Sequence, residues 1–453
     1  TIQNLNPRAL AVADSLDAVQ RMGGTLGPLH CVPVLLKDQI ETRDMPTTYG
    51  SALFKDFLPA RDATVVTRLE AAGAIILAKT TMGEFASRYV GSGFGIIRNA
   101  YDPTRNPSGS SGGTGSGVAA SFGLVGLGED TGGSVRGPAA VSGLVGLRPT
   151  LQLVSRQGML PANPTQDTMG PMTRTVMDAA LLLDVMAGYD PEDPLTAYAV
   201  GHIPSSYVPA LSTDALRGVR IGVLREPMDT SGRAESEDVA QVEAVFNQAM
   251  NDLRSLGAEI VDSLVIDSLA GVRGIDNNFE TERATDDYLR GHPNAPVKTF
   301  KEIMLSGVVI PVRARGMMDL VGKTTQDPGY LTVIQKRETL RLAVLKAMAD
   351  QGLDAIVYPT FTNQPASIPD DVLVNARPKD GYAKGDNRGL SPAIGFPALT
   401  VPAGLTADGL PVGLEFLGRP FSEKQLFRFG YAYEQATHRR RPPPTTPPLG
   451  SGR

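Results

Sequence analysis

The sequence has very little of what metal and disulfide chemistry needs. It holds one cysteine, Cys31, and four histidines, at positions 30, 202, 292 and 438. One cysteine excludes a disulfide framework and any cysteine-rich zinc or iron–sulfur site. No two histidines lie within one helical turn, so the HExxH zinc motif is missing. We therefore expect no metal ion and no cofactor.

Basic charge and long apolar runs are also lacking. The 43 Lys and Arg residues are outnumbered by 48 Asp and Glu residues, which gives a net charge of −5. Without a basic field, nucleic acid is not expected as the main ligand. No run of 18 apolar residues is present, so the sequence predicts no membrane span. The chain begins at Thr1 without a methionine, and the sequence does not identify its compartment.

The rest of the chain alternates between helical and strand-like segments. We predict helices at 62–72 with Asp62 as N-cap, from Thr80 or Thr81 through Phe85, and at 173–187, 236–256 and 331–350. We predict strands at 74–78, 219–224, 258–261 and 353–358. This alternation favours an α/β protein with a mostly buried, mixed sheet. Residues 442–453, rich in Pro, Gly and Thr, predict a loose tail.

The most informative region is rich in glycine and serine and spans residues 106–148. Two glycine-rich turns, at 109–117 and 128–136, lie between apolar segments, which is unlike a flexible linker. Residues 115–120 fit the loose dinucleotide pattern GxGxxA, and residues 109–113 fit the GxSxG nucleophile elbow. Both motifs must follow a strand, whereas residues 106–114 are polar and rich in turn formers. We therefore expect turns that bring backbone N–H groups close to a ligand.

In these motifs the sequence resembles the amidase signature hydrolases. The resemblance rests on the segments GSSGG at 109–113, DTGGSVR at 130–136 and VPVLLKD at 32–38. It continues at 78–85, 146–150, 167–175 and 395–404, and is weaker from about 190 to 350. It implies one large domain over residues 1–441, with a central mixed sheet flanked by helices. Lys37 lies nearer the chain start than in that family, so we expect a segment to precede Thr1.

Two residues depart from the family pattern. Cys31 stands where glycine is usual and Thr81 where asparagine is common. Neither position carries chemistry in the family, so the expected mechanism is unchanged.

The resemblance implies a catalytic triad of Ser134, Ser110 and Lys37. Ser134 would be the nucleophile, and Ser110, after a cis Gly109–Ser110 peptide bond, would relay its proton to Lys37. The residues independently favour this chemistry, because a serine hydroxyl needs a base and no histidine has a suggestive context. Lys37 follows the apolar run Val34-Leu35-Leu36, and burial favours the neutral amine that a base requires.

The segment around Ser134 is expected to supply the remaining groups. The backbone N–H groups of Thr131, Gly132, Gly133 and Ser134 would form the oxyanion hole, and Ser111 would support the network. For Asp130 and Arg136, which flank the turn, we predict a structural ion pair.

Two functions are compatible with this site. We favour a serine hydrolase that cleaves the C–N bond of a small-molecule amide, such as an aryl amide or a carbamate, through an acyl-enzyme. The alternative is the A subunit of a tRNA-dependent glutamyl/aspartyl-tRNA amidotransferase, which acts as a glutaminase and needs protein partners. Residues 91–95 resemble that branch, but residues 310–316 do not resemble its glutamine-binding segment. No nucleic acid is expected unless the alternative holds, and a homodimer stays open.

The substrate is expected to be set by the variable segment at about 190–350. It contains apolar residues that line a pocket or belong to the core, so none is assigned to binding: Phe279, Tyr288, Met304, Met317, Met318 and Tyr330.

Overall fold

The computed structural model describes residues 1–227, 237–267, 269, 277–379 and 386–447. The predicted helix start at Ser236 and the tail residues 448–453 lie outside these ranges. In the described part of the tail, the Thr445 hydroxyl donates a hydrogen bond to the carbonyl of Ala100.

The centre of the molecule is one 11-stranded sheet with the order β1-β3-β2-β6-β8-β7-β12-β13-β11-β9-β10. β2 is parallel to β3 and β6, and β9 is parallel to β10 and β11, whereas the remaining pairs are antiparallel. The predicted α/β fold with a mixed sheet is thus confirmed. The strands are β1 Ile2–Leu5, β2 Pro33–Lys37, β3 Ile75–Thr80, β6 Val125–Asp130, β7 Val145–Arg148, β8 Thr168–Thr173, β9 Arg220–Val223, β10 Glu259–Asp262, β11 Ala355–Pro359, β12 Ala398–Leu405 and β13 Pro411–Leu417, with a separate hairpin of β4 Val90–Gly91 and β5 Gly95–Ile96.

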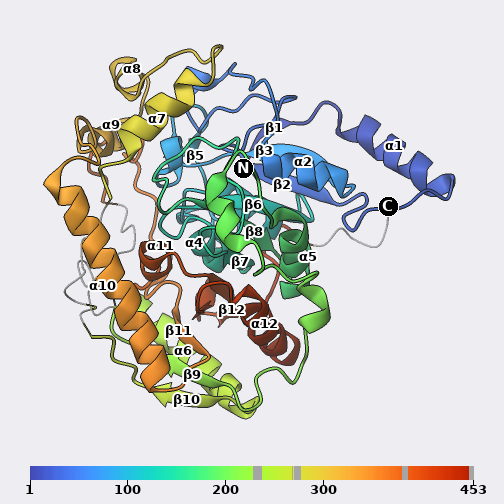
Figure 1. Cartoon of the computed structure of the whole chain (residues 1–453), viewed down its shortest axis with the longest axis vertical. Helices are drawn as coiled ribbons and strands as arrows, with labels where there is room; N and C mark the ends of the chain where they lie inside the picture. Colours follow the sequence, from blue (N-terminus) through green and yellow to red (C-terminus); the bar gives the residue numbers. More distant parts are fainter. Residues whose placement is uncertain (228–236, 268, 270–276, 380–385, 448–453) are drawn as a thin grey trace.

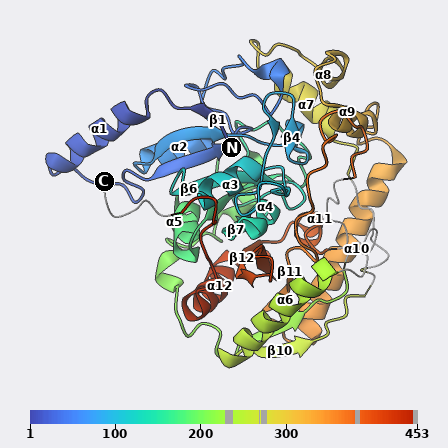
Figure 2. The same cartoon turned by 180° about the vertical axis from the view of Figure 1, so that it is seen from behind.

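Helices cover both faces of the sheet (Figure 1, Figure 2). One face packs against α2, α5, α6 and α12, and the other against α3, α4, α10 and α11. The helices are α1 Ala9–Arg21, α2 Thr64–Ala71, α3 Gly112–Ala119, α4 Arg136–Val141, α5 Val176–Met186, α6 Glu237–Ser255, α7 Thr281–Arg290, α8 Phe300–Leu305, α9 Pro311–Met318, α10 Pro328–Asp350, α11 Leu390–Ile394 and α12 Glu423–Thr437. Over the described residues, no helix has the length and apolar character needed to cross a membrane.

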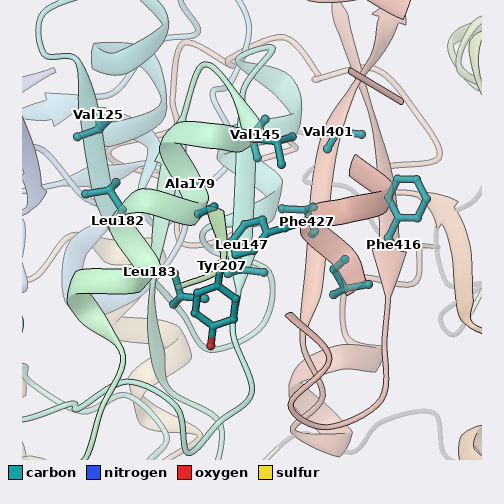
Figure 3. Packing of buried hydrophobic residues seen from close by; sticks show 14 of the residues in the cluster. Val125, Val145, Leu147, Ala179, Leu182, Leu183, Tyr207, Val401, Phe416 and Phe427 are labelled. Atoms are coloured by element: carbon teal, nitrogen blue, oxygen red, sulfur yellow. The ribbon is translucent and has the colours of Figure 1, made fainter. Parts of the chain in front are cut away.

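The largest core cluster lies between the sheet and the helices α2, α5, α6 and α12. Figure 3 shows Ala179, Leu182 and Leu183 of α5 beside Val145 and Leu147 of β7. All five side chains are fully buried, and complete burial of one aliphatic side chain stabilises a fold by about 1.5–3 kcal/mol. The same cluster includes Val125 and Leu127 of β6, the strand that leads into the second glycine-rich turn.

Two predicted helix starts are wrong. Asp62 does not cap α2, because the helix begins after Ala63 without a side-chain cap; the Asp62 carboxylate instead accepts the N–H of Arg43 at 2.8 Å. The predicted helix at 173–187 begins only at Val176, capped by the Thr175 hydroxyl. The preceding residues belong to strand β8, which was not predicted from the sequence.

The predicted helix that begins at Thr80 or Thr81 is also wrong. The chain forms a single 3₁₀ turn at Glu84–Ala86 (η2) instead, and Phe85 has a positive φ of 47° that no regular helix contains. Tertiary contacts override the local helix signal, because the N–H of Gly83 donates to the carbonyl of Ser110 at 3.0 Å. This hydrogen bond ties the segment to the candidate site.

Candidate active site

The site lies where two parallel strands end. Leu36 of β2 is paired with Leu127 of β6, so the next residues of both strands reach the same edge of the sheet. Lys37 is the last residue of β2, and Glu129 lies near the end of β6. Side chains at the carboxyl ends of neighbouring parallel strands converge there, which is the usual place for a site in an α/β sheet.

Lys37 is buried and bonded on all sides. Its Nζ lies 2.8 Å from Ser110 Oγ, 2.7 Å from Glu129 Oε2 and 3.2 Å from the Glu129 carbonyl oxygen. The side chains of Lys37 and Glu129 are both 0% exposed. When Lys37 gives up a proton to act as the base, its amine keeps two N–H donors for the Glu129 oxygens and gains a lone pair that can accept the Ser110 hydroxyl proton.

The backbone before Ser110 is tightly enclosed. The Gly109–Ser110 peptide bond is cis. A Cβ atom on Gly109 would lie 1.7 Å from the carbonyl oxygen of Arg88, so only glycine fits at this position. Ser110 itself precedes α3, which packs against β2 and β6, and this packing places its hydroxyl beside Lys37.

Ser134 lies in the turn between β6 and α4 and is half-buried. Its carbonyl oxygen accepts the N–H of Ser111 at 3.4 Å. Its hydroxyl has no hydrogen-bond partner among the residues that the structure describes. The structure thus joins Lys37 and Ser110 directly, whereas no hydrogen bond joins the hydroxyls of Ser134 and Ser110.

The turn itself is shaped by Asp130. Gly133 has a φ of 112°, which favours glycine. Its N–H donates to Asp130 Oδ1 at 2.7 Å, and the N–H of Val135 donates to Asp130 Oδ2 at 3.2 Å. The Gly133 N–H, assigned to the oxyanion hole from the sequence, is therefore already engaged. Within the described part of the chain, the N–H groups of Gly132 and Ser134 have no acceptor.

The predicted ion pair between Asp130 and Arg136 is present. Arg136 Nε lies 3.1 Å from Asp130 Oδ2, and Arg148 Nη1 lies 3.2 Å from Asp130 Oδ1. Burial would raise the pKa of Asp130, but the two guanidinium groups outweigh it and hold the pKa well below its usual range. Asp130 is therefore a structural anion that fixes the turn.

Three groups in the site were missed by sequence reasoning: the side chains of Glu129, Thr131 and Asp167. The Thr131 hydroxyl lies 2.5 Å from Glu129 Oε1 and 2.8 Å from Asp167 Oδ1. For Glu129 the sequence does carry a signal, a carboxylate at the end of the otherwise apolar stretch Val125-Gly-Leu-Gly-Glu129. A carboxylate buried with such a stretch needs a charged or hydrogen-bonding partner. Ser111, the predicted supporting residue, holds the backbone of Glu129 through hydrogen bonds of 3.2 and 3.3 Å.

Two pockets lie in this part of the molecule. The first is mostly apolar and is lined by Gln39, two positions after Lys37, and by Met82, next to the Gly83 that is bonded to Ser110; its other lining residues are Phe85, Ala86, Leu160, Pro161, Ala162, Thr281, Thr285, Phe300, Ile303, Arg313 and Met317. The second is an open pocket of about 230 Å³ with a mixed polar and apolar lining that includes Arg156, Asp167 and Asp193. Among the described residues, no three His, Cys, Asp or Glu side chains are grouped so that they could hold a metal ion.

The comparisons with known proteins identify the family. The model of the Amidase family matches residues 1–427. The chain belongs to the amidase signature family. Its fold, one domain with a large mixed sheet flanked by helices, is that of the solved amidase signature enzymes.

Individual relatives fall into two groups. The A subunit of the glutamyl-tRNA(Gln) amidotransferase of Rhodopirellula baltica is 34% identical, and the match covers 97% of this amidase-family chain and 90% of the relative. The peptide amidase of Stenotrophomonas maltophilia is 34% identical with a TM-score of 0.84, over 98% of this chain and 90% of that one. The A subunit of the glutamyl-tRNA(Gln) amidotransferase of Thermotoga maritima is 26% identical with a TM-score of 0.70, over 91% and 84% of the two chains.

Proposed function

We propose that this amidase-family enzyme hydrolyses a carboxamide through an acyl-enzyme on Ser134. The observation that carries the proposal is the buried hydrogen bond between Lys37 Nζ and Ser110 Oγ at 2.8 Å, next to the Gly-Gly-Ser turn. A hydroxyl bonded to a buried amine can relay a proton, and Ser134 in the adjacent turn is only half-buried, so a substrate can reach it.

The reaction proceeds in two proton-balanced halves. In the first, the Ser134 oxygen attacks the amide carbonyl while its proton passes to Ser110, whose own proton passes to Lys37. The proton then returns to the leaving nitrogen as the C–N bond breaks. In the second half, water takes the place of Ser134 and restores the hydroxyl. For this relay, the Ser134 side chain must turn toward Ser110 when substrate is bound.

The negative oxygen of the tetrahedral intermediate needs donors. The N–H groups of Gly132 and Ser134 are suited to this role because they have no acceptor among the described residues. Thr131 and Gly133 belong to the proposed hole as well, although the Gly133 N–H donates to Asp130 in this structure. Loss of one such donor costs about 2.7–4 kcal/mol in the transition state.

For the substrate, the sequence relatives favour the amidotransferase alternative over the stand-alone hydrolase preferred from the sequence. The relative from Rhodopirellula baltica is the A subunit of an amidotransferase, and the match extends over 90% of its length. The corresponding function here is release of ammonia from glutamine, for use by partner proteins in a tRNA-dependent complex.

The apolar pocket favours a second candidate, hydrolysis of an amide or carbamate with an apolar acyl or aryl group. Its lining contains Phe85, Phe300 and Met317, with Arg313 as the one cationic side chain and no carboxylate among its described residues. Free glutamine is a zwitterion, and its ammonium group finds no anionic partner there. The structural similarity to peptide amidase, with a TM-score of 0.84, supports this candidate too.

One assay separates the two candidates. Purified protein is given glutamine, an acyl anilide and a peptide amide, and release of ammonia or aniline is followed, with Ser134→Ala as the blank. Turnover of glutamine alone supports the amidotransferase function, and turnover of the anilide or peptide amide supports the hydrolase. Hydrolysis that persists in Ser134→Ala contradicts the proposed chemistry for both.

A further inference from the structure

A chain of four side chains runs from the base into the protein. Lys37 Nζ contacts Glu129 Oε2 at 2.7 Å. Glu129 Oε1 lies 2.5 Å from the Thr131 hydroxyl, which lies 2.8 Å from Asp167 Oδ1. Asp167 also lines the open pocket of about 230 Å³. Of these four side chains the proposed reaction uses only that of Lys37, so the side chains of Glu129, Thr131 and Asp167 have no part in it.

The hydroxyl in this chain has one hydrogen but faces two carboxyl groups. It can donate to only one of them, so the other must donate to it. Asp167 Oδ2 already accepts the N–H groups of Ala162 and Asn163, both at 2.8 Å, which leaves Oδ1 to carry a proton. Burial raises the pKa of Asp167 to about 8, and the charge of Glu129 adds to the effect. The hydrogen bonds therefore run from Asp167 through Thr131 to Glu129.

The charged groups around this chain are few. Lys37 on β2 faces Glu129, and the guanidinium of Arg148 on β7 also acts on Glu129. The guanidinium of Arg156 interacts with Asp167, but its own hydrogen bonds go to Asp193, at 2.7 and 2.9 Å, and to the carbonyl of Pro164 at 2.5 Å.

We propose that Glu129, Thr131 and Asp167 are positioning residues that hold the Lys37 amine against Ser110. We propose further that the hydrogen-bonded series from Asp167 to Lys37 is continuous only while Asp167 is protonated. This proposal rests on the proposed function, because it assigns Lys37 as the base. Lys37 Nζ makes three hydrogen bonds. The carboxylate and the backbone carbonyl of Glu129 take two of them, and this orients the third toward Ser110. Thr131 and protonated Asp167 keep the Glu129 carboxylate from rotating.

Loss of the Asp167 proton interrupts the series of hydrogen bonds from Asp167 to Lys37. Two carboxylates then compete for one hydroxyl hydrogen, and Glu129 loses its bond to Thr131 or faces a second negative charge. We expect the turnover number to decline on the alkaline side, near pH 8, through loss of alignment rather than of substrate binding.

The first test compares Thr131→Val with Thr131→Ser on whichever substrate the wild type turns over. Both variants keep the backbone N–H proposed for the oxyanion hole, but only serine keeps the hydroxyl. We expect Thr131→Val to lower kcat by about tenfold to a hundredfold, the effect of losing a hydrogen bond to a charged group, with KM changed less than about twofold. Thr131→Ser should recover most of the loss. Equal kcat values for the two variants would overturn the proposal.

The second test, Asp167→Asn, remains informative even if Thr131→Val does not fold. Asparagine imitates the protonated acid, because its oxygen can accept the two backbone N–H groups while its NH₂ donates to Thr131. The alkaline decline of kcat should disappear in this variant, and a decline identical to that of the wild type would contradict the proposal. Activity that survives in Ser134→Ala would instead contradict the underlying function, so the two failures are distinguishable.

Discussion

The pair of Lys37 and Glu129 should dominate both stability and activity at the centre of this enzyme. We consider three variants: Lys37→Met, Glu129→Gln and the two combined. Each single variant leaves one buried charge without its partner, because both side chains are 0% exposed and their charged atoms lie 2.7 Å apart. The double variant removes both charges while keeping similar volumes.

The expected sizes follow from the burial of the pair. Breaking a buried ion pair by removal of one partner costs about 3–5 kcal/mol, whereas replacing both partners with uncharged groups is often close to neutral. Each single variant should therefore lose about 3–5 kcal/mol of unfolding free energy, and the double variant much less than their sum. Lys37→Met and the double variant should both lose at least about 10²-fold in amide hydrolysis, the usual value of a general base.

Urea denaturation at one pH, followed by far-UV circular dichroism, measures the three free energies of unfolding. The double-mutant cycle should give a coupling energy of several kcal/mol. Single variants that each lose less than about 1 kcal/mol and add within about 0.5 kcal/mol, as independent sites do, would refute the reasoning.

Three further outcomes are expected. The pKa of Asp167 in the folded protein is raised from 3.8 to about 8, so its contribution to stability is present below about pH 4 and is lost as pH rises toward 8. The Tm measured across this pH range should therefore fall less in Asp167→Asn than in the wild type. Parallel curves of Tm against pH would contradict the assignment. Gly109→Ala should prevent folding or abolish activity, because its Cβ would lie 1.7 Å from the carbonyl oxygen of Arg88. Gly132→Ala is the control: its Cβ would meet nothing within 4 Å, so this variant should fold with wild-type Tm. Because the sequence has no clustered histidines or cysteines, activity should persist in excess EDTA, and loss that a divalent ion restores would contradict that expectation.

Local sequence patterns predicted much of the fold but missed elements shaped by distant contacts. Long segments with strong periodicity, such as α6 and α10, were predicted within a few residues of their observed ends. The turn at Glu84–Ala86 was wrongly predicted as a helix. The positive φ of Phe85 goes with contacts from distant segments, since its N–H donates to the carbonyl of Tyr49 and the neighbouring Gly83 N–H donates to Ser110. Strand β6 was not predicted, since its glycines at 126 and 128 obscure the apolar pattern.

The candidate site was predicted in part. Lys37, Ser110 and Ser134 came from motifs, and the structure places the first two in direct contact. Glu129 and Asp167 could not be paired from sequence, because they lie 38 positions apart and meet only through the antiparallel pairing of β6 with β8 and the Thr131 hydroxyl. Motifs identify residues that react, whereas the groups that orient them depend on which strands become neighbours.

The central claim, a covalent acyl-enzyme on Ser134, is tested most directly by mass spectrometry. The protein is mixed with an activated acyl ester, quenched in acid within milliseconds to seconds, and measured intact and after proteolysis. We predict one added acyl group, located on the peptide that contains Ser134 and absent from Ser134→Ala. An acyl group on another residue, or turnover of the ester with no covalent adduct on the wild type at any time point, would contradict the assignment of Ser134 as nucleophile.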